Sequence, residues 1–426
     1  MNTAYEREVA LLPIVLEMEQ KGVPLSHEVH DMYDHWQDVF DQGEDYIENL
    51  CGDGIKVGSK AMFQHFRNQG LIDESKIQFT EKGNPRFGRE FLHDLVTDEK
   101  LKQVLLMRSK LEKIIGTYLR PWSQAAIKND FRTYPFFSQT RGDDDYGTRT
   151  GRFSSNMQQV PKEPEKGMPN LRSMIVAEKG HTLLQRDFSG QEIRVAAHYA
   201  NEAWQARESM DCKILQAYRD NPSLDAHEFV QAMVKETTGV ELKRKQVKII
   251  SFMKLYGGGP KAAMGGMGVD YDTALEFYKA YDKALPEFKE LADWCTVQVE
   301  EKEQIVTWGG RAYGVEMVSV PGGRKFGDHQ AERKKALYYK LINVLVQGSS
   351  ADMTKEAMLR YQSRKHPDAR IMLQVHDELV VTCPEHLATT EMEVLRWAMD
   401  EIPGWDVPLR SDGGIGHNFG ELEDCG

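Results

Sequence analysis

Two short apolar runs, separated by three ionisable residues, mark the segment 371–381, IMLQVHDELVV. Apolar runs on either side of a polar break are typical of a β-hairpin that is buried on one side. Because unpaired charge is costly to bury, the residues at the break, His376, Asp377 and Glu378, are not expected to serve packing. A solvated turn has the same pattern, so this segment alone leaves both interpretations open.

A second apolar run also ends at a carboxylate. Residues 182–185 lead into Asp187, the pair Ser189 and Gly190 breaks the pattern, and residues 191–199 have helical spacing. The pattern predicts a strand that ends near Asp187 and is followed by a helix. We expect Asp187 and Asp377 to meet through the fold, with no adjacent lysine to neutralise them. Two such carboxylates suit a pair of Mg²⁺ ions.

The segment 241–260, ELKRKQVKIISFMKLYGGGP, places Arg244, Lys248, Phe252 and Tyr256 at steps of four. On a helix each step of four drifts by only about 40°, so the four side chains form one row. Two cations followed by two aromatic rings fit a triphosphate at one end and a base with its sugar at the other. An amphipathic helix with a charged rim is the alternative. Gly257–Pro260 are expected to end the helix.

These segments resemble the motifs of a known family. DFSGQEIR (187–194), the R-x3-K-x3-F-x3-YG row and QVHDE (374–378) are similar to motifs A, B and C of family A DNA polymerases. TRTGRFSSNMQQVP (148–161) and NVLVQGSSAD (343–352) resemble two further blocks, and the similarity runs from about Glu6 to the last residues. Five positions depart from the usual residues: Gly190, Gln191, Ser251, Met253 and Tyr339.

The resemblance implies an α+β fold with right-hand polymerase architecture, in which a palm with an antiparallel sheet carries a helical thumb and helical fingers. The expected boundaries are 31–121 for the thumb, 1–30, 122–206 and 345–426 for the palm, and 207–344 for the fingers. The thumb would grip the phosphates of the product duplex. Its lysines would equally fit a solvated basic rim; they are Lys100, Lys102, Lys110 and Lys113.

The resemblance also implies a reaction, in which a DNA-directed DNA polymerase adds dNTPs to a primer 3′-hydroxyl and releases pyrophosphate. Asp187 and Asp377 would hold two Mg²⁺ ions, with Mn²⁺ able to substitute. Glu378 would be an accessory carboxylate near the metals, and Lys248 would take part in catalysis.

Further roles are implied for residues that match the family motifs. Arg244, Lys248 and His227 would cradle the triphosphate, although a lone histidine is more often structural. Phe252 and Tyr256 would lie near the sugar and base, and Glu192 would be a steric gate against a ribose 2′-hydroxyl. Four residues would contact primer–template DNA: Arg152, Asn343, Gln347 and His376.

Composition places few further limits. The chain has 426 residues and a formal net charge of −12, so nucleic-acid binding needs a local basic region, such as the lysines between 235 and 261. Five scattered cysteines without a CxxC pair argue against disulfides and favour the cytoplasm. No apolar run reaches the length of a membrane span. Because the resemblance covers a short chain and the family includes phage enzymes, we expect a viral protein in a bacterial host cell.

Elsewhere the pattern predicts mostly helices. The expected ranges are 5–21, 55–71, 89–96, 98–119, most of 202–284 and a long region 330–364. Residues 132–161 are expected to be irregular, with a charged loop at 141–145, and residues 309–313 to form a turn.

Three rival functions remain open at this point. A single-subunit RNA polymerase would share the palm chemistry, a replication scaffold would bind DNA without reacting, and a metal-dependent nuclease would also use paired carboxylates. Because the similarity begins close to Met1, we expect a polymerase module without an exonuclease domain, either naturally short or truncated. Proofreading and processivity would then come from a separate exonuclease or processivity factor.

Overall fold

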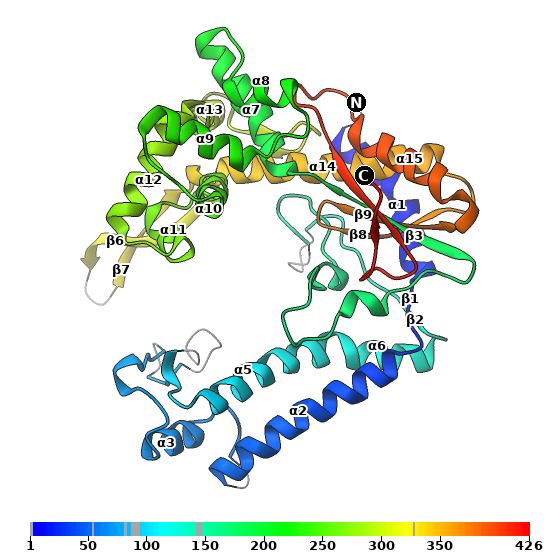
Figure 1. Ribbon diagram of the computed structural model, residues 1–426. Coiled ribbons are helices and arrows are strands. Elements are labelled where there is room, and N and C mark those ends of the chain that lie inside the picture. The colour runs from blue at the N-terminus through cyan, green and yellow to red at the C-terminus, as the bar shows by residue number, and fades with distance from the viewer. Residues whose placement is uncertain (1–2, 53–54, 81–82, 87–93, 142–146, 327–328) are drawn as a thin grey trace.

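The computed structural model describes the chain apart from residues 1–2, 53–54, 81–82, 87–93, 142–146 and 327–328. Figure 1 shows a sheet on the right, a helical arm below it and a group of helices to the upper left. We call residues 29–128 the helical arm and residues 213–302 the helical lobe. Both extend from the part of the chain that contains the sheet.

The sheet is antiparallel and has the strand order β11-β10-β3-β9-β8. Its strands are β3 (His181–Phe188), β8 (Arg370–Val375), β9 (Glu378–Pro384), β10 (Ser411–Gly416) and β11 (Glu423–Asp424). All of β8 and nearly all of β9 are buried, as expected for strands that are covered on both faces. The predicted hairpin at 371–381 and the predicted strand that ends near Asp187 are confirmed. The expectation that the hairpin is buried on one side only is wrong, because residues on both faces of β8 and β9 are buried.

Helices from distant parts of the sequence pack around this sheet. They are α1 (Ala4–Lys21), α7 (Gln191–Glu208), α14 (Leu341–Arg364) and α15 (Ala388–Asp400). Of these, α15 contacts β3, β9 and β10, α1 contacts β8, and α14 packs on α1, α7 and α15. The predicted helix at 5–21 is confirmed, and a capping box between Thr3 and Glu6 fixes its start. A short pairing of β1 (Val23–Pro24) with β2 (Arg132–Thr133) closes the base of the arm.

The helical arm is built from two long, antiparallel stretches of helix (Figure 1). Its elements are α2 (Val29–Cys51), α3 (Lys60–Asn68), η1 (Glu74–Lys76), α5 (Glu99–Ile114), the π-helical turn η2 (Ile115–Leu119) and α6 (Arg120–Lys128). The helix predicted at 98–119 is confirmed and starts where the Asp98 side chain accepts from the Leu101 N–H. The one predicted at 55–71 is shorter, beginning after its N-cap Ser59. The predictions at 89–96 and 141–145 fall largely outside the described residues.

The helical lobe consists of short helices, as the pattern predicted. They are α8 (Lys213–Asp220), α9 (Ala226–Thr238), α10 (Arg244–Leu255), α11 (Pro260–Met267), α12 (Tyr271–Ala284) and α13 (Pro286–Lys302). Helix α10 ends before Gly257, which has a φ of +72°, and Pro260 starts α11. The turn predicted at 309–313 joins the short strands β4 (Ile305–Val306) and β5 (Ala312–Tyr313).

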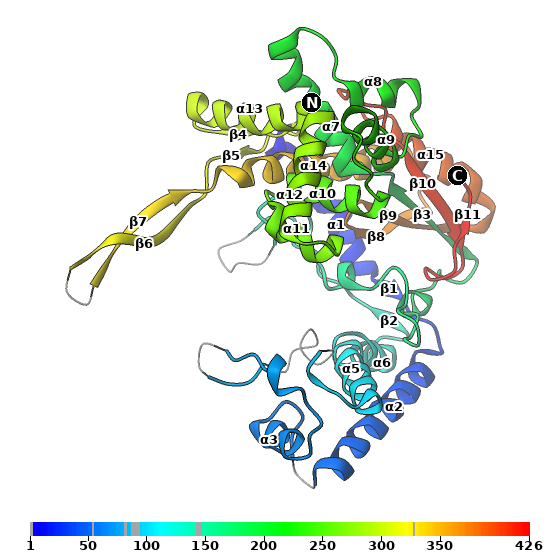
Figure 2. The ribbon, with the colours of Figure 1, turned by 60° about the vertical axis from the view of Figure 1, so that its left-hand side comes forward.

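The prediction of one helical region at 330–364 is wrong at its start. Residues His329–Ala336 form β7, which pairs with β6 (Met317–Phe326) in a ribbon that projects from the molecule (Figure 2). Helix α14 begins only at Leu341, after the short turn η5 (Tyr338–Lys340). The sequence QAERKKA (330–336) has good helix propensity, but pairing with β6 supplies its backbone hydrogen bonds, so tertiary context overrides propensity.

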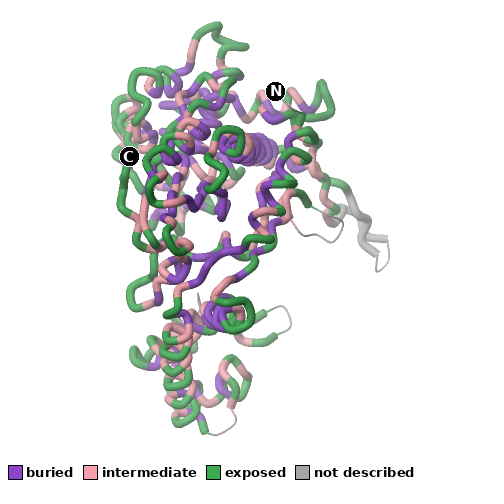
Figure 3. Tube along the Cα trace, turned by 90° about the vertical axis from the view of Figure 1, so that its right-hand side faces the viewer, coloured by how far each residue is buried: buried purple, intermediate pink, exposed green. Residues whose placement is uncertain are grey.

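Among the described residues the buried apolar side chains form two separate clusters. The larger one joins the sheet, the surrounding helices, the helical lobe and the base of the arm. The smaller one lies in the outer part of the arm, between residues 47 and 105. Figure 3 shows this outer part at the bottom, with fewer buried positions than the body above it. The arm tip therefore has a small core of its own.

Candidate functional site

The tip of the β8–β9 hairpin is a two-residue loop. Val375 pairs with Glu378, which leaves His376 and Asp377 as the loop. His376 has a φ of +58°, in the left-handed region that residues other than glycine enter at a cost. The Asp377 carbonyl accepts from the Phe188 N–H at 3.3 Å, so the hairpin tip lies against the end of β3. This contact places Asp377 beside the strand that carries Asp187.

Asp187 lies in a row of carboxylates across the sheet. Its register partners are Glu378 on β9 and Asp412 on β10. Directly paired residues of antiparallel strands point to the same face, so three acidic side chains gather there. Burial, with the negative charge of Asp187 as the second cause, raises the pKa of Asp377 to about 7. The structure thus brings the two predicted aspartates together.

The expectation that no lysine neutralises these aspartates is wrong. The Lys162 ammonium donates to Asp187 Oδ2 at 2.7 Å. Lys162 is 25 residues before Asp187 in the sequence, and only the fold of the segment after Pro161 brings it there. The site therefore carries its own counter-ion.

Glu378 is less available than the sequence suggested. It is buried, and its two carboxylate oxygens accept from the Arg172 guanidinium at 3.2 and 3.3 Å. Burial raises the pKa of Glu378, and the charge of Arg172 opposes that shift. Both oxygens of Glu378 are already bonded to Arg172. This arrangement suits a residue that holds the hairpin tip in place better than it suits a direct metal ligand.

The cation–aromatic row lies on α10, with Tyr256 at the C-terminal cap of the helix. The rings of Phe252 and Tyr256 stack with centroids 6.2 Å apart, and the Lys248 ammonium lies 5.9 Å from the Phe252 centroid. Arg244 Nε donates to Asp225 Oδ2 at 3.0 Å. Asp225 also caps α9 by accepting from the N–H groups of His227 and Glu228.

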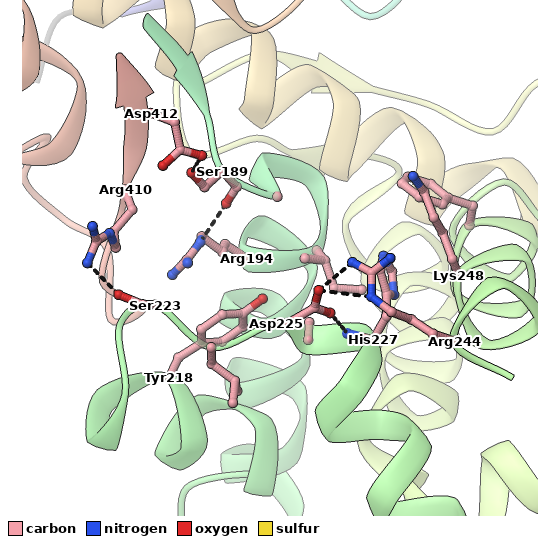
Figure 4. Close-up of a pocket in the computed structure, with 15 residues that line it drawn as sticks. Ser189, Arg194, Tyr218, Ser223, Asp225, His227, Arg244, Lys248, Arg410 and Asp412 are labelled. Atoms are coloured by element: carbon pink, nitrogen blue, oxygen red, sulfur yellow. Dashed lines mark hydrogen bonds and ion pairs between the residues drawn. The ribbon is translucent and has the colours of Figure 1, made fainter. Parts of the chain in front are cut away.

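A pocket of about 420 Å³ lies between α10 and the start of α7. Figure 4 shows Asp225 joined by dashed lines to the Arg244 guanidinium and to His227, with Arg194 and Arg410 on the opposite side of Asp225. Burial lowers the pKa of His227, so its ring is neutral near pH 7. Its Nδ1 is buried without a hydrogen-bond partner, a costly state that a ligand would relieve. Four cationic side chains line this pocket, Arg194, Arg244, Lys248 and Arg410, together with the carboxylates of Asp225 and Asp412.

A second pocket of about 370 Å³ continues from the first, since both are lined by Gly190, Ile193, His227 and Phe252. At its other end Glu192 forms an ion pair with Arg152 and accepts from the Tyr256 hydroxyl at 2.7 Å. Burial and the charge of Glu192 raise the pKa of Tyr256 to about 12. His376 and Asp377 also line this pocket, so it connects the cationic pocket with the hairpin tip.

Of the two residues predicted on α14, Gln347 lies at the site and Asn343 does not. Gln347 donates to the Tyr256 hydroxyl at 3.0 Å and so joins the network of Glu192 and Arg152. Asn343, one turn earlier, is half-buried and lines neither pocket. The structure therefore groups every predicted residue except Asn343 around the two pockets and the hairpin tip.

Sequence reasoning missed Lys162, Arg172 and Asp225. Asp225 had a usable signal, because an aspartate two residues before His227, at the start of a helical pattern, is a typical N-cap. Lys162 and Arg172 had none, since their partners are distant in the sequence.

Two of the unusual residues have structural partners. Gln191 is buried and donates to the Ser350 carbonyl at 3.2 Å and to the Thr354 hydroxyl at 3.1 Å, so it ties α7 to α14. The Ser251 hydroxyl lies 3.1 Å from the Tyr281 hydroxyl inside the helical lobe. These departures are accommodated by packing away from the aspartates.

Within the described part of the chain, no group of three or more His, Cys, Asp or Glu side chains is arranged to hold a metal ion. In the same part, no helix has the length and apolar character that crossing a membrane requires.

Comparisons with known proteins agree with this architecture. The chain is similar to the polymerase domain of Pol1 from M. smegmatis, described in complex with DNA primer–template and dNTP, with a TM-score of 0.76, 22% identity, and coverage of 97% of this chain and 70% of that one. It is 27% identical to the thermostable DNA polymerase I of Thermus filiformis over 98% of this chain and 48% of the relative. It is 29% identical to DNA polymerase I of Pseudomonas aeruginosa over 97% of this chain and 44% of that relative.

The fold is that of a polymerase domain, which confirms the predicted α+β, right-hand architecture. The sequence model of DNA polymerase family A matches residues 26–421, and the chain belongs to this family. It spans about half the length of the curated relatives that it matches. The three named relatives are bacterial proteins, and the expected viral origin stays a prediction.

Proposed function

We propose that this chain is a template-directed DNA polymerase that adds dNTPs to a primer 3′-hydroxyl by two-metal nucleotidyl transfer. The observation that carries the proposal is the meeting of Asp187 and Asp377 beside the pocket lined by His227, Arg244 and Lys248. The ligands named for the M. smegmatis Pol1 domain, primer–template and dNTP, support the same substrate classes for this chain.

Asp187 and Asp377 fit Mg²⁺ or Mn²⁺, because both side chains offer hard anionic oxygens. The raised pKa of Asp377 reflects burial and repulsion from Asp187, and a divalent cation would relieve both. Bound ions would lower the pKa of the primer hydroxyl and neutralise the leaving pyrophosphate. The contribution of the protein is to hold the two carboxylates at adjacent strand ends.

The cationic pocket would bind the triphosphate. Arg244 would exchange its ion pair with Asp225 for phosphate oxygens, which it can contact as a fork. Lys248 would face the leaving pyrophosphate as a point charge, and His227 would offer its unpartnered Nδ1. Phe252 and Tyr256, stacked further along the row, would contact the sugar and base.

The second pocket would hold the nascent base pair. Glu192 would exclude a 2′-hydroxyl by its bulk, and Arg152 would leave Glu192 to reach the minor groove at the primer end. Gln347 would contact DNA after Tyr256 moves, while Asn343 would contact it from the exposed side of α14. His376, exposed at the hairpin tip, would lie at the primer terminus.

We also propose the assignment of the parts of the hand. The helical arm would supply the thumb (31–121), and the helical lobe with the ribbon would supply the fingers (207–344). The sheet and its helices would supply the palm (1–30, 122–206 and 345–426). The separate apolar cluster between residues 47 and 105 supports treating the outer arm as a unit of its own.

The test is extension of a labelled primer on a template with Mg²⁺ and dNTPs. Wild type should extend the primer, Asp377→Asn should be slower by about 10³-fold or more, and Asp220→Asn, an exposed aspartate at the end of α8, should match wild type. Extension with rNTPs but not dNTPs would favour an RNA polymerase. Duplex binding by wild type without extension would favour a scaffold, and shortening of the DNA a nuclease.

A further inference from the structure

The ion pair between Lys162 and Asp187 has little value for the stability of the fold. The Lys162 side chain is 64% exposed, and exposed ion pairs contribute about 0 to 1 kcal/mol. A long, exposed lysine can also leave its partner at little cost. The pair nevertheless involves Asp187, one of the two carboxylates that would bind metal in the proposed function.

A metal ion and this lysine compete for the same oxygen. Lys162 Nζ lies 2.7 Å from Asp187 Oδ2, and a Mg²⁺ ion would have to approach that carboxylate to about 2.1 Å. Two cations at such distances repel each other, so metal binding requires the ammonium to move away. Arg172 forms its ion pair with Glu378 and not with Asp187. Among the described contacts, Lys162 is therefore the cation that pairs with Asp187.

Lys162 belongs to a short connection that also contacts the helical arm. We call residues 160–169, VPKEPEKGMP, the strap. Three residues after Lys162, Glu165 forms an ion pair with Lys110 on α5. A pocket of about 430 Å³ lies between the strap and α5, so the strap has room to shift. The strap is thus fixed at one point to the arm and at another to the catalytic aspartate.

We propose that Lys162 is a positioning residue that occupies Asp187 until primer–template DNA binds the arm, and then leaves the carboxylate to a metal ion. DNA phosphates would compete with Glu165 for Lys110 and so loosen the strap. By linkage, a metal that displaces Lys162 would in turn favour the DNA-bound arm. The inference rests on the proposed function, because it takes Asp187 as a metal ligand.

The test counts Mn²⁺ bound to DNA-free protein, with free Mn²⁺ measured by electron paramagnetic resonance. Lys162→Met should lower the Mn²⁺ dissociation constant about tenfold, because the competing charge is gone. Lys162→Arg keeps the charge, and Lys166→Met removes a charge elsewhere on the strap. Both should bind Mn²⁺ as wild type does.

The same measurement with primer–template bound tests the link to the arm. The effect of Lys162→Met should then vanish, since DNA has already displaced the lysine; a tenfold effect that persists would overturn the link. Unchanged Mn²⁺ affinity of DNA-free Lys162→Met, with binding lost in Asp377→Asn, would overturn the inference and leave the proposed function standing. Wild-type Mn²⁺ binding by Asp377→Asn would overturn the metal site and the inference together.

Discussion

Asp377 links the chemistry of the site to the pH dependence of folding. Its folded pKa of about 7 lies above the value of about 3.9 for an unfolded aspartate. The folded state therefore holds the proton more tightly, and this contribution to stability is present below about pH 3.9 and lost as the pH rises to about 7. An asparagine at 377 cannot ionise, so it avoids that loss.

We therefore expect metal-free Asp377→Asn to be more stable than wild type at pH 8, by about 1 kcal/mol or more, with the gain shrinking toward pH 4. Urea unfolding in the presence of EDTA at several pH values measures this difference. Asp220→Asn, on the surface of α8, controls for the loss of a carboxylate. A gain that stays constant across the pH range would contradict the shifted pKa.

Glu192 combines two effects that substitutions can separate. Its bulk would exclude a ribose 2′-hydroxyl, while its charge holds Arg152 and the Tyr256 hydroxyl. Glu192→Ala removes both and should raise ribonucleotide incorporation relative to dNTP incorporation by about tenfold or more. Glu192→Gln keeps the volume and should stay selective. The measurement is kcat/KM for dNTP and rNTP in each variant, and equal loss of selectivity in both variants would show that charge, not bulk, discriminates.

At the scale of elements, a buried ionic network fixes α14 against the turn after β4. Asp352 on α14 is fully buried and accepts from Arg311 Nε and from the Thr307 hydroxyl, each at 2.7 Å. Arg311 also pairs with Glu8 on α1. Gly309 lies so close that a Cβ there would be 2.3 Å from the Asp352 carboxyl carbon. The same network therefore joins the first helix, the turn and the long helix behind the sheet.

Asp352→Ala should destabilise the protein by about 3 kcal/mol, because it leaves a buried guanidinium with one partner fewer. Urea unfolding measures the change. The matched control is Glu74→Ala, which removes the carboxylate of an exposed pair with Arg67 and should cost less than about 1 kcal/mol. Similar losses in both variants would mean that burial adds nothing to the Asp352 network.

The elements with strong patterns were predictable from the sequence. The hairpin at 371–381, the strand before Asp187 and the helix of the cation–aromatic row each combine apolar periodicity with clear start or stop residues. The β6–β7 ribbon could not be predicted in this way. The residues of β7 favour a helix, and they form a strand because they pair with β6. Helix α2 was also missed, although its apolar positions have helical spacing; its buried residues are only Val29, Ile47 and Cys51. The counter-ion Lys162 depends on tertiary contact alone.

On the scale of the whole molecule, the candidate site is formed by segments that are far apart in the sequence and meet in the fold. Asp187 comes from the end of β3 and Asp377 from the tip of the β8–β9 hairpin, most of the cationic pocket comes from the helical lobe, and Lys162 comes from the strap that contacts the arm. The larger apolar cluster unites the first two parts, whereas the outer arm has its own smaller cluster. The arm tip should therefore open more easily than the catalytic body, since small cores contribute little stability.

Phe66→Ala tests this division, because Phe66 is fully buried in the smaller cluster and its truncation should cost about 3 kcal/mol or more. If the tip is a separate unit, hydrogen exchange should rise within residues 47–105 and stay unchanged in the sheet. Primer–template affinity should then fall about tenfold while kcat at saturating DNA is kept, because the proposed function assigns DNA holding to the arm and the reaction to the aspartates. Phe79→Ala, at an exposed position of the same tip, should change neither. A rise in exchange throughout the sheet would instead show that arm and catalytic body unfold as one cooperative unit.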